Sequence, residues 1–133
     1  GLRDKPLYRL KGWRHLAGSV EQLRCHQYNL AALMLADARQ IDRATLALHT
    51  ANVQRDRLPR RRLASTDILR QTLPRITCPV QAVYGQEGVL CRGLWPQVAA
   101  CFGGRLQLIA GAGHWVQYEQ PGVFAEAVLP MLL

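Results

Sequence analysis

Residues 110–121 read Ala-Gly-Ala-Gly-His-Trp-Val-Gln-Tyr-Glu-Gln-Pro. His114 lies in this glycine-rich stretch, shortly after the apolar run Leu106–Ile109. Histidine titrates near neutral pH, so a histidine on a loop that follows a strand suits general acid–base chemistry. A histidine that only bonds a backbone carbonyl is the alternative. The stretch predicts a strand, a tight loop that presents His114, and a helix that Pro121 opens.

The residues before this stretch predict a second strand. Residues 79–85, Pro-Val-Gln-Ala-Val-Tyr-Gly, form a short strand pattern with proline at its start and glycine at its end. Residues 94–101 can form a helix that Gly103-Gly104 ends, and residues 105–109 form the next strand. Strand, helix, strand, helix is typical of a parallel pair with a right-handed crossover. We therefore predict an α/β fold in which residues 74–133 form a β-α-β-α unit, with any chemistry at the carboxyl ends of its strands.

Residues 1–73 differ from the rest because their apolar residues recur at helical spacing. Ser19 and Asp37 are each followed by glutamine three positions later, a helix-start signal. A third helix is predicted from about Thr66 to Leu73, before Pro74. The chain is thus divided into a helical segment, 1–73, and an α/β segment, 74–133.

Composition limits the classes of partner. The 133 residues carry a net charge of +8, with a dense arginine run at positions 55, 57 and 60–62. A basic run can neutralise nucleic-acid phosphates, but it lacks interleaved aromatic residues here and follows no known DNA-binding pattern, so a solvated linker is favoured. No apolar run is long enough to span a bilayer. We expect neither a nucleic acid nor a membrane as a partner.

Four scattered cysteines, at 25, 78, 91 and 101, show no Cys-x-x-Cys spacing. We therefore expect no metal site, no cofactor and a reduced, cytoplasmic setting. The first residue is Gly1 rather than methionine, which suggests a piece of a longer protein.

The segment Ile76-Thr-Cys-Pro-Val-Gln-Ala-Val-Tyr-Gly85, together with Ala110-Gly-Ala-Gly-His-Trp115 and Glu119-Gln-Pro121, resembles the end of an α/β-hydrolase. The helical first half is similar to the cap that such enzymes insert after the sixth strand. Its Asn29–Leu35 stretch, with Ile41-Asp42, Asn52 and the arginine run, resembles caps of the carbon–carbon bond and ester hydrolases.

The resemblance implies a triad of serine, acid and histidine with backbone amides as the oxyanion hole. His114 falls on the histidine position, where it would take the proton of the nucleophile and pass it to the leaving group. Trp115 and Val116 would line the substrate pocket beside it. Packing in the core is the alternative for Trp115.

Two features depart from the family pattern. No Gly-x-Ser-x-Gly occurs, and the only serines are Ser19 and Ser65. Gly88 stands where the family commonly has its aspartate. Glu87, one residue earlier, is the candidate acid, with a solvent-facing glutamate as the alternative, and Asp4 is a more distant candidate.

These observations predict a fragment of a serine-type hydrolase that is inactive alone. It would act on a small ester or ketone-type substrate once joined to its N-terminal half. The alternative is a non-catalytic interaction module derived from the same fold. Because one edge of the strand at 80–84 lacks its usual neighbours, we also expect a homo-oligomer that covers it.

Overall fold

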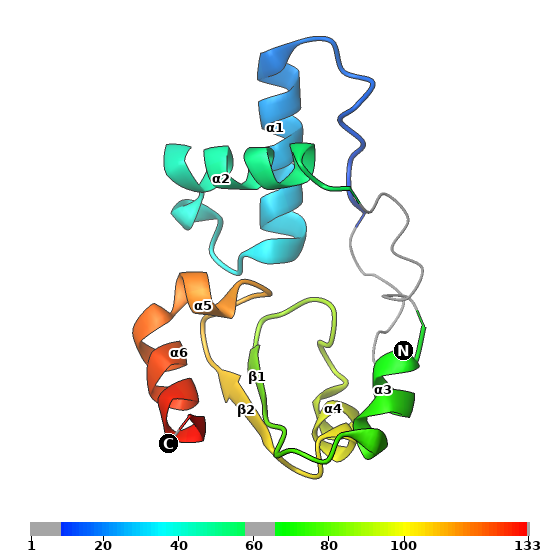
Figure 1. Cartoon of the computed structure of the whole chain (residues 1–133). Coiled ribbons are helices and arrows are strands. Elements are labelled where there is room, and N and C mark those ends of the chain that lie inside the picture. Colours follow the sequence, from blue (N-terminus) through cyan, green and yellow to red (C-terminus); the bar gives the residue numbers. More distant parts are fainter. Residues whose placement is uncertain (1–8, 58–65, 133) are drawn as a thin grey trace.

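Two short strands pair in parallel in the C-terminal half of the computed structural model, which describes residues 9–57 and 66–132 (Figure 1). Strand β1 (Ala82–Gly85) pairs with β2 (Leu106–Ile109), with Ala82 opposite Leu106 and Gly85 opposite Ile109. Helix α4 (Trp95–Cys101) connects them, and Gly103 and Gly104 follow it with φ of 60° and 80°. The predicted parallel pair and the glycine helix stop are confirmed. Asp4 and Arg60–Arg62 lie outside the described residues.

Two helices follow the sheet. Helix α5 (Val116–Glu119) is a single turn, and α6 (Pro121–Val128) runs on into a 3-10 turn at Leu129–Met131. A small core of Ile109, Ala112, Val116 and Ala127 joins β2 to these helices, with Val83 and Phe124 packed against it. Helix α6 therefore packs one face, which carries Phe124 and Ala127, against the sheet.

The N-terminal half is helical, as predicted. Helix α1 (Ser19–Asn29) continues as a π-helical turn at Leu30–Met34, and a 3-10 turn (Ala38–Gln40) precedes α2 (Arg43–Gln54). Helix α3 (Ile68–Thr72) leads into a 3-10 turn at Leu73–Arg75. Among the residues described, no helix is long and apolar enough to cross a membrane.

Both predicted helix-start signals need correction. Gly18, not Ser19, precedes α1, and the Gln22 side chain donates to the Leu16 carbonyl at 2.7 Å. Asp37 caps only the short 3-10 turn, through the amide of Arg39. The cap of α2 is Asp42, whose carboxylate accepts from the Thr45 amide at 2.7 Å.

The two halves meet at α5. Figure 1 shows α1 and α2 on one side of α5, with β1, β2 and α6 on the other side. Helix α3, which belongs to the helical segment in sequence, lies beside α4 in this view. The loop that carries His114 is therefore at the junction of the helical and α/β halves.

Candidate functional site

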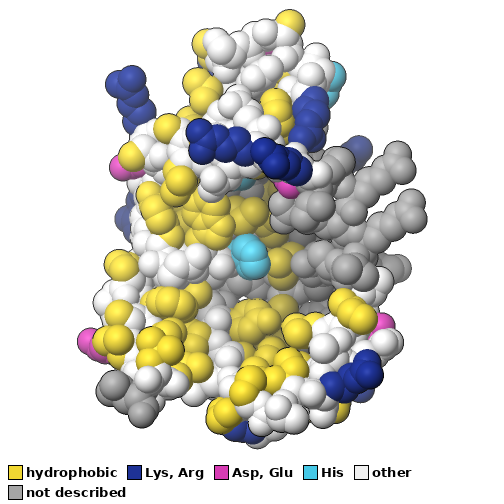
Figure 2. Space-filling view, viewed as in Figure 1, with side chains coloured by type: hydrophobic (Ala, Val, Ile, Leu, Met, Phe, Trp, Pro, Cys, Tyr) yellow, Lys and Arg dark blue, Asp and Glu magenta, His cyan; other side chains and the backbone are white. Residues whose placement is uncertain are grey.

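The His114 loop joins the carboxyl end of β2 to α5. Gly111 turns the chain there with φ of 69°, a conformation that favours glycine. The His114 side chain is exposed and lines a cavity of about 580 Å³. Most of the other lining residues are apolar, among them Ile68, Leu69, Val83, Leu90, Trp95, Val116 and Phe124. Figure 2 shows hydrophobic side chains gathered around a hollowed region of this face.

The loops after β1 and β2 are in direct contact. The Glu87 amide donates to the Ala112 carbonyl at 2.9 Å, and the Gln86 amide donates to the Ile109 carbonyl at 2.9 Å. Gly85 has no room for a side chain, because a Cβ there would lie 2.1 Å from the Gly113 carbonyl oxygen. The two strand ends thus present their loops as one surface, as expected of a parallel pair.

The Glu87 side chain is 44% exposed, and its carboxylate lies 3.7 Å from the Arg92 guanidinium. Arg92 also donates to the Glu87 backbone carbonyl at 2.9 Å. Glu87 is not among the described residues that line the cavity with His114. Its assignment as the triad acid remains a prediction.

Gly88 is the residue of this loop that is buried beside the His114 loop. A Cβ at Gly88 would lie 3.9 Å from the Gly113 carbonyl carbon, one residue before His114. Its φ is not among the positive values that only glycine adopts easily. The nearest obstacle is the Gly85 carbonyl oxygen, at 3.0 Å. The backbone therefore admits an aspartate at position 88 after a small adjustment.

We expect Gly88→Asp to raise the midpoint of the His114 imidazole titration by about one pH unit. A carboxylate within about 4–6 Å stabilises the imidazolium form. The measurement is an NMR titration of the His114 ring protons. Gly88→Ala adds the same Cβ without the charge and should leave the midpoint unchanged. Equal midpoints in both variants would show that position 88 does not face His114.

Trp115 and Val116 have different surroundings. Val116 is 5% exposed and lines the cavity with His114. The Trp115 ring lies 6.0 Å from the His49 ring of the helical half and 5.8 Å from the Tyr118 ring of α5 itself. Its amide donates to the Met34 carbonyl at 2.9 Å. Of the two residues predicted to bind substrate, the structure brings Val116 to the cavity and makes Trp115 a contact between the halves.

The aromatic contacts continue into the helical half through two buried histidines. His49 is 5.5 Å from His26 between ring centroids, and His26 is 5.0 Å from Trp13. His26 is fully buried, and within residues 9–57 and 66–132 neither of its ring nitrogens has a hydrogen-bond partner. Burial lowers the pKa of His26, while burial and then repulsion from His26 lower the pKa of His49.

These lowered pKa values predict loss of stability in mild acid. Below pH 6.5, the ordinary histidine pKa, the unfolded chain binds protons that the folded chain does not, so stability falls as pH falls. We expect the free energy of unfolding to fall between pH 7 and pH 5, by no more than about 1.4 kcal/mol per pH unit for each histidine. Urea unfolding measures it.

Two substitutions test whether the buried histidines cause this acid sensitivity. His49→Phe should reduce the pH dependence by about half, because one of the two buried imidazoles is then absent. His15→Gln, which changes an exposed histidine, should leave the dependence as it is. An unfolding free energy that is constant from pH 7 to pH 5 would contradict the assignment of neutral imidazoles.

Glu119 is the site residue that the sequence reasoning missed. It is 7% exposed, and its carboxylate accepts hydrogen bonds from three backbone amides. The segment Glu119-Gln-Pro121 carries part of the family resemblance, but the sequence shows only a charged residue two positions before Pro121 and gives it no role. That pattern does not separate a buried glutamate from an exposed one.

Within residues 9–57 and 66–132, no group of three or more histidine, cysteine, aspartate or glutamate side chains is placed to hold a metal ion. Comparison of the chain with models of protein families, with curated proteins and with solved structures finds no match. The functional argument therefore depends on the geometry around His114.

Proposed function

We propose that this chain is the cap and C-terminal portion of a serine-type α/β-hydrolase, with His114 as the general base. The observation that carries the proposal is the position of His114, which is exposed beside a cavity at the carboxyl end of a parallel strand. Histidine needs an adjacent hydroxyl to activate, and the sequence holds no Gly-x-Ser-x-Gly. The nucleophile and oxyanion loop would come from a preceding half, so the chain alone is inactive.

The cavity supports a small, largely apolar substrate. Its volume of about 580 Å³ lies within the usual range for small-molecule sites. Val83, Trp95 and Phe124 contribute apolar walls, and His114 supplies a group that transfers protons. An ester or a ketone-type compound fits this chemistry, because its reacting carbonyl can lie at the histidine while its apolar body lies in the cavity.

Exposed apolar side chains support a covering half. Helix α3 exposes Ile68 and Leu69 by 44% and 45%, and the C-terminal end exposes Leu129 and Leu132 by 57% and 74%. Contiguous exposed apolar surface is typical of interaction sites, and the proposal takes these side chains as part of such a surface. The N-terminal half of the hydrolase would cover it in the assembled enzyme.

The same exposed surface favours a second candidate function, a non-catalytic interaction module that forms a homo-oligomer. Sedimentation of the isolated chain at micromolar concentration, combined with an activity assay, distinguishes the two candidate functions. The module predicts a stable oligomer and no turnover with any preceding sequence. The hydrolase predicts turnover once the preceding half is present.

The test of the proposed function is hydrolysis of a nitrophenyl ester by two chains. The isolated chain should show no turnover that depends on His114. A longer chain that includes the preceding coding sequence should contain a Gly-x-Ser-x-Gly segment and hydrolyse the ester. A preceding sequence without this segment would overturn the proposal, and so would a His114-dependent rate in the isolated chain.

A further inference from the structure

We infer that Glu119 is a positioning residue that sets the place of His114 relative to the helical cap. The inference deepens the proposed function and depends on it for its catalytic meaning. Glu119 is in α5, next to the junction of the two halves (Figure 1). Its carboxylate contacts the backbone of both halves, one of them through the residue before His114.

The two carboxylate oxygens have different partners. Oε2 accepts from the Gly113 amide at 2.5 Å, so it holds the residue that precedes His114. Oε1 accepts from the Ala36 amide at 2.7 Å and from the Asp37 amide at 3.1 Å. These two amides follow the π-helical turn of the cap, 82 and 83 residues away in sequence. One buried side chain therefore fixes both segments at once.

The two segments are also in close steric contact. A Cβ on Gly113 would lie 2.8 Å from the Ala36 nitrogen and 2.9 Å from the Met34 carbonyl oxygen. The Trp115 amide donates to that same Met34 carbonyl at 2.9 Å. The residues on both sides of His114 are thus held by the segment at 34–37, one through Glu119 and the other directly. A shift of the cap there would move His114.

Glu119 acts through the backbone. Among the described residues it is not part of the cavity lining, and the contacts of its carboxylate are backbone amides. A carboxylate suits this position because both of its oxygens accept hydrogen bonds. A glutamine offers one oxygen and one NH₂ group, so one of the two segments would meet a donor instead of an acceptor.

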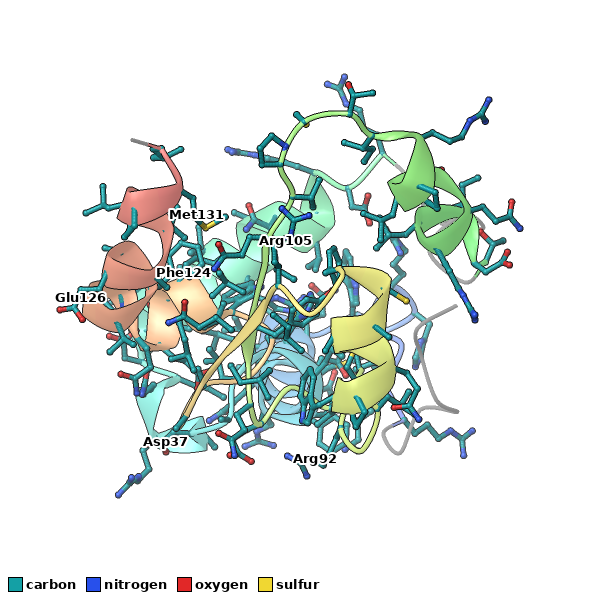
Figure 3. All side chains as sticks on the ribbon, turned by 90° about the horizontal axis from the view of Figure 1, so that it is seen from below. Asp37, Arg92, Arg105, Phe124, Glu126 and Met131 are labelled. Atoms are coloured by element: carbon teal, nitrogen blue, oxygen red, sulfur yellow. The ribbon has the colours of Figure 1, made fainter. Side chains whose placement is uncertain are left out.

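The experiment compares Glu119→Gln with Glu126→Gln in the isolated chain by NMR. Glu126 is on the outer face of α6 and is exposed, so it serves as the matched control (Figure 3). We expect Glu119→Gln to accelerate hydrogen exchange of the Gly113 amide by about tenfold to a hundredfold, the loss expected for a hydrogen bond to a charged group. It should also shift the His114 ring resonances, at a pH where circular dichroism shows a folded chain. Glu126→Gln should change neither.

His114 ring resonances that stay the same in folded Glu119→Gln would overturn the inference. If that variant does not fold, amide hydrogen exchange in the unsubstituted chain tests the inference. Shared protection of the Gly113, Ala36 and Asp37 amides supports the inference, and exchange of Gly113 at the rate of an unstructured amide contradicts it. None of these readouts requires turnover. Failure of the hydrolase proposal would therefore appear in the ester assay, and failure of this inference in the NMR data.

Discussion

His114→Ala should lower kcat for a nitrophenyl ester by about four orders of magnitude in the longer hydrolase that we propose. The imidazole takes the proton of the attacking hydroxyl and returns it to the leaving group, and removal of a triad member costs an effect of this size. KM should change little, because the cavity walls formed by residues such as Val83 and Phe124 remain. Steady-state kinetics with the ester measures both constants.

His15→Ala is the matched control, because His15 is also an exposed histidine but is distant in sequence from the strand-end loops. It should leave kcat within a factor of two, by the usual small effect of surface substitutions. In the isolated chain neither substitution should change the background rate. A longer enzyme that keeps its kcat after His114→Ala would show that another group is the general base.

Gly85→Ala should destabilise the folded chain by about 3 kcal/mol or more, the upper range for overpacked sites. A Cβ at Gly85 would lie 2.1 Å from the Gly113 oxygen, and 2.4 Å and 2.6 Å from the carbonyl oxygen and carbon of Ala112. All three atoms belong to backbone, which cannot move aside as the end of a flexible side chain can. The substitution should also separate the loop after β1 from the His114 loop. Urea unfolding measures the loss of stability.

Gly122→Ala is the control for this substitution. Gly122 is in α6, and a Cβ there would have no atom of the described residues within 4 Å. Alanine has less conformational freedom than glycine in the unfolded chain and fits the helix. We therefore expect Gly122→Ala to raise the free energy of unfolding by up to about 1 kcal/mol. If Gly85→Ala unfolds at the same urea concentration as the unaltered chain, the two loops do not approach as closely as described.

Several contacts across the junction connect the helical half directly to α5 and the His114 loop. The Tyr118 hydroxyl lies 2.7 Å from the Thr45 hydroxyl of α2, and Trp115 contacts His49 of the same helix. Glu119 adds its bonds to the Ala36 and Asp37 amides. If His114 is the general base, as we propose, these contacts make the placement of the helical half a determinant of its position.

Local sequence determined the parallel strand pair, the crossover helix and the loop that presents His114. Gly85 ends the strand predicted at 79–85, glycines end α4, and Pro121 opens α6, so these boundaries follow from the backbone preference of a nearby residue. The shorter observed strand, Ala82–Gly85, reflects the extent of its pairing with β2. The start of α2 was predicted less well, because Asp37 and Asp42 both precede helical turns and either can act as a cap.

Tertiary structure alone decided the roles of Glu119, His26 and His49. The amides that Glu119 binds in the helical half are more than eighty residues away, and no periodic pattern encodes such a contact. The two histidines are buried because α1 and α2 pack together. Their positions in the helical pattern are equally compatible with a solvent-exposed face. Propensity and hydrophobic spacing act over a few residues, and thus determine elements and loops. Burial of a polar group depends on which distant segments meet, and only the folded chain determines that.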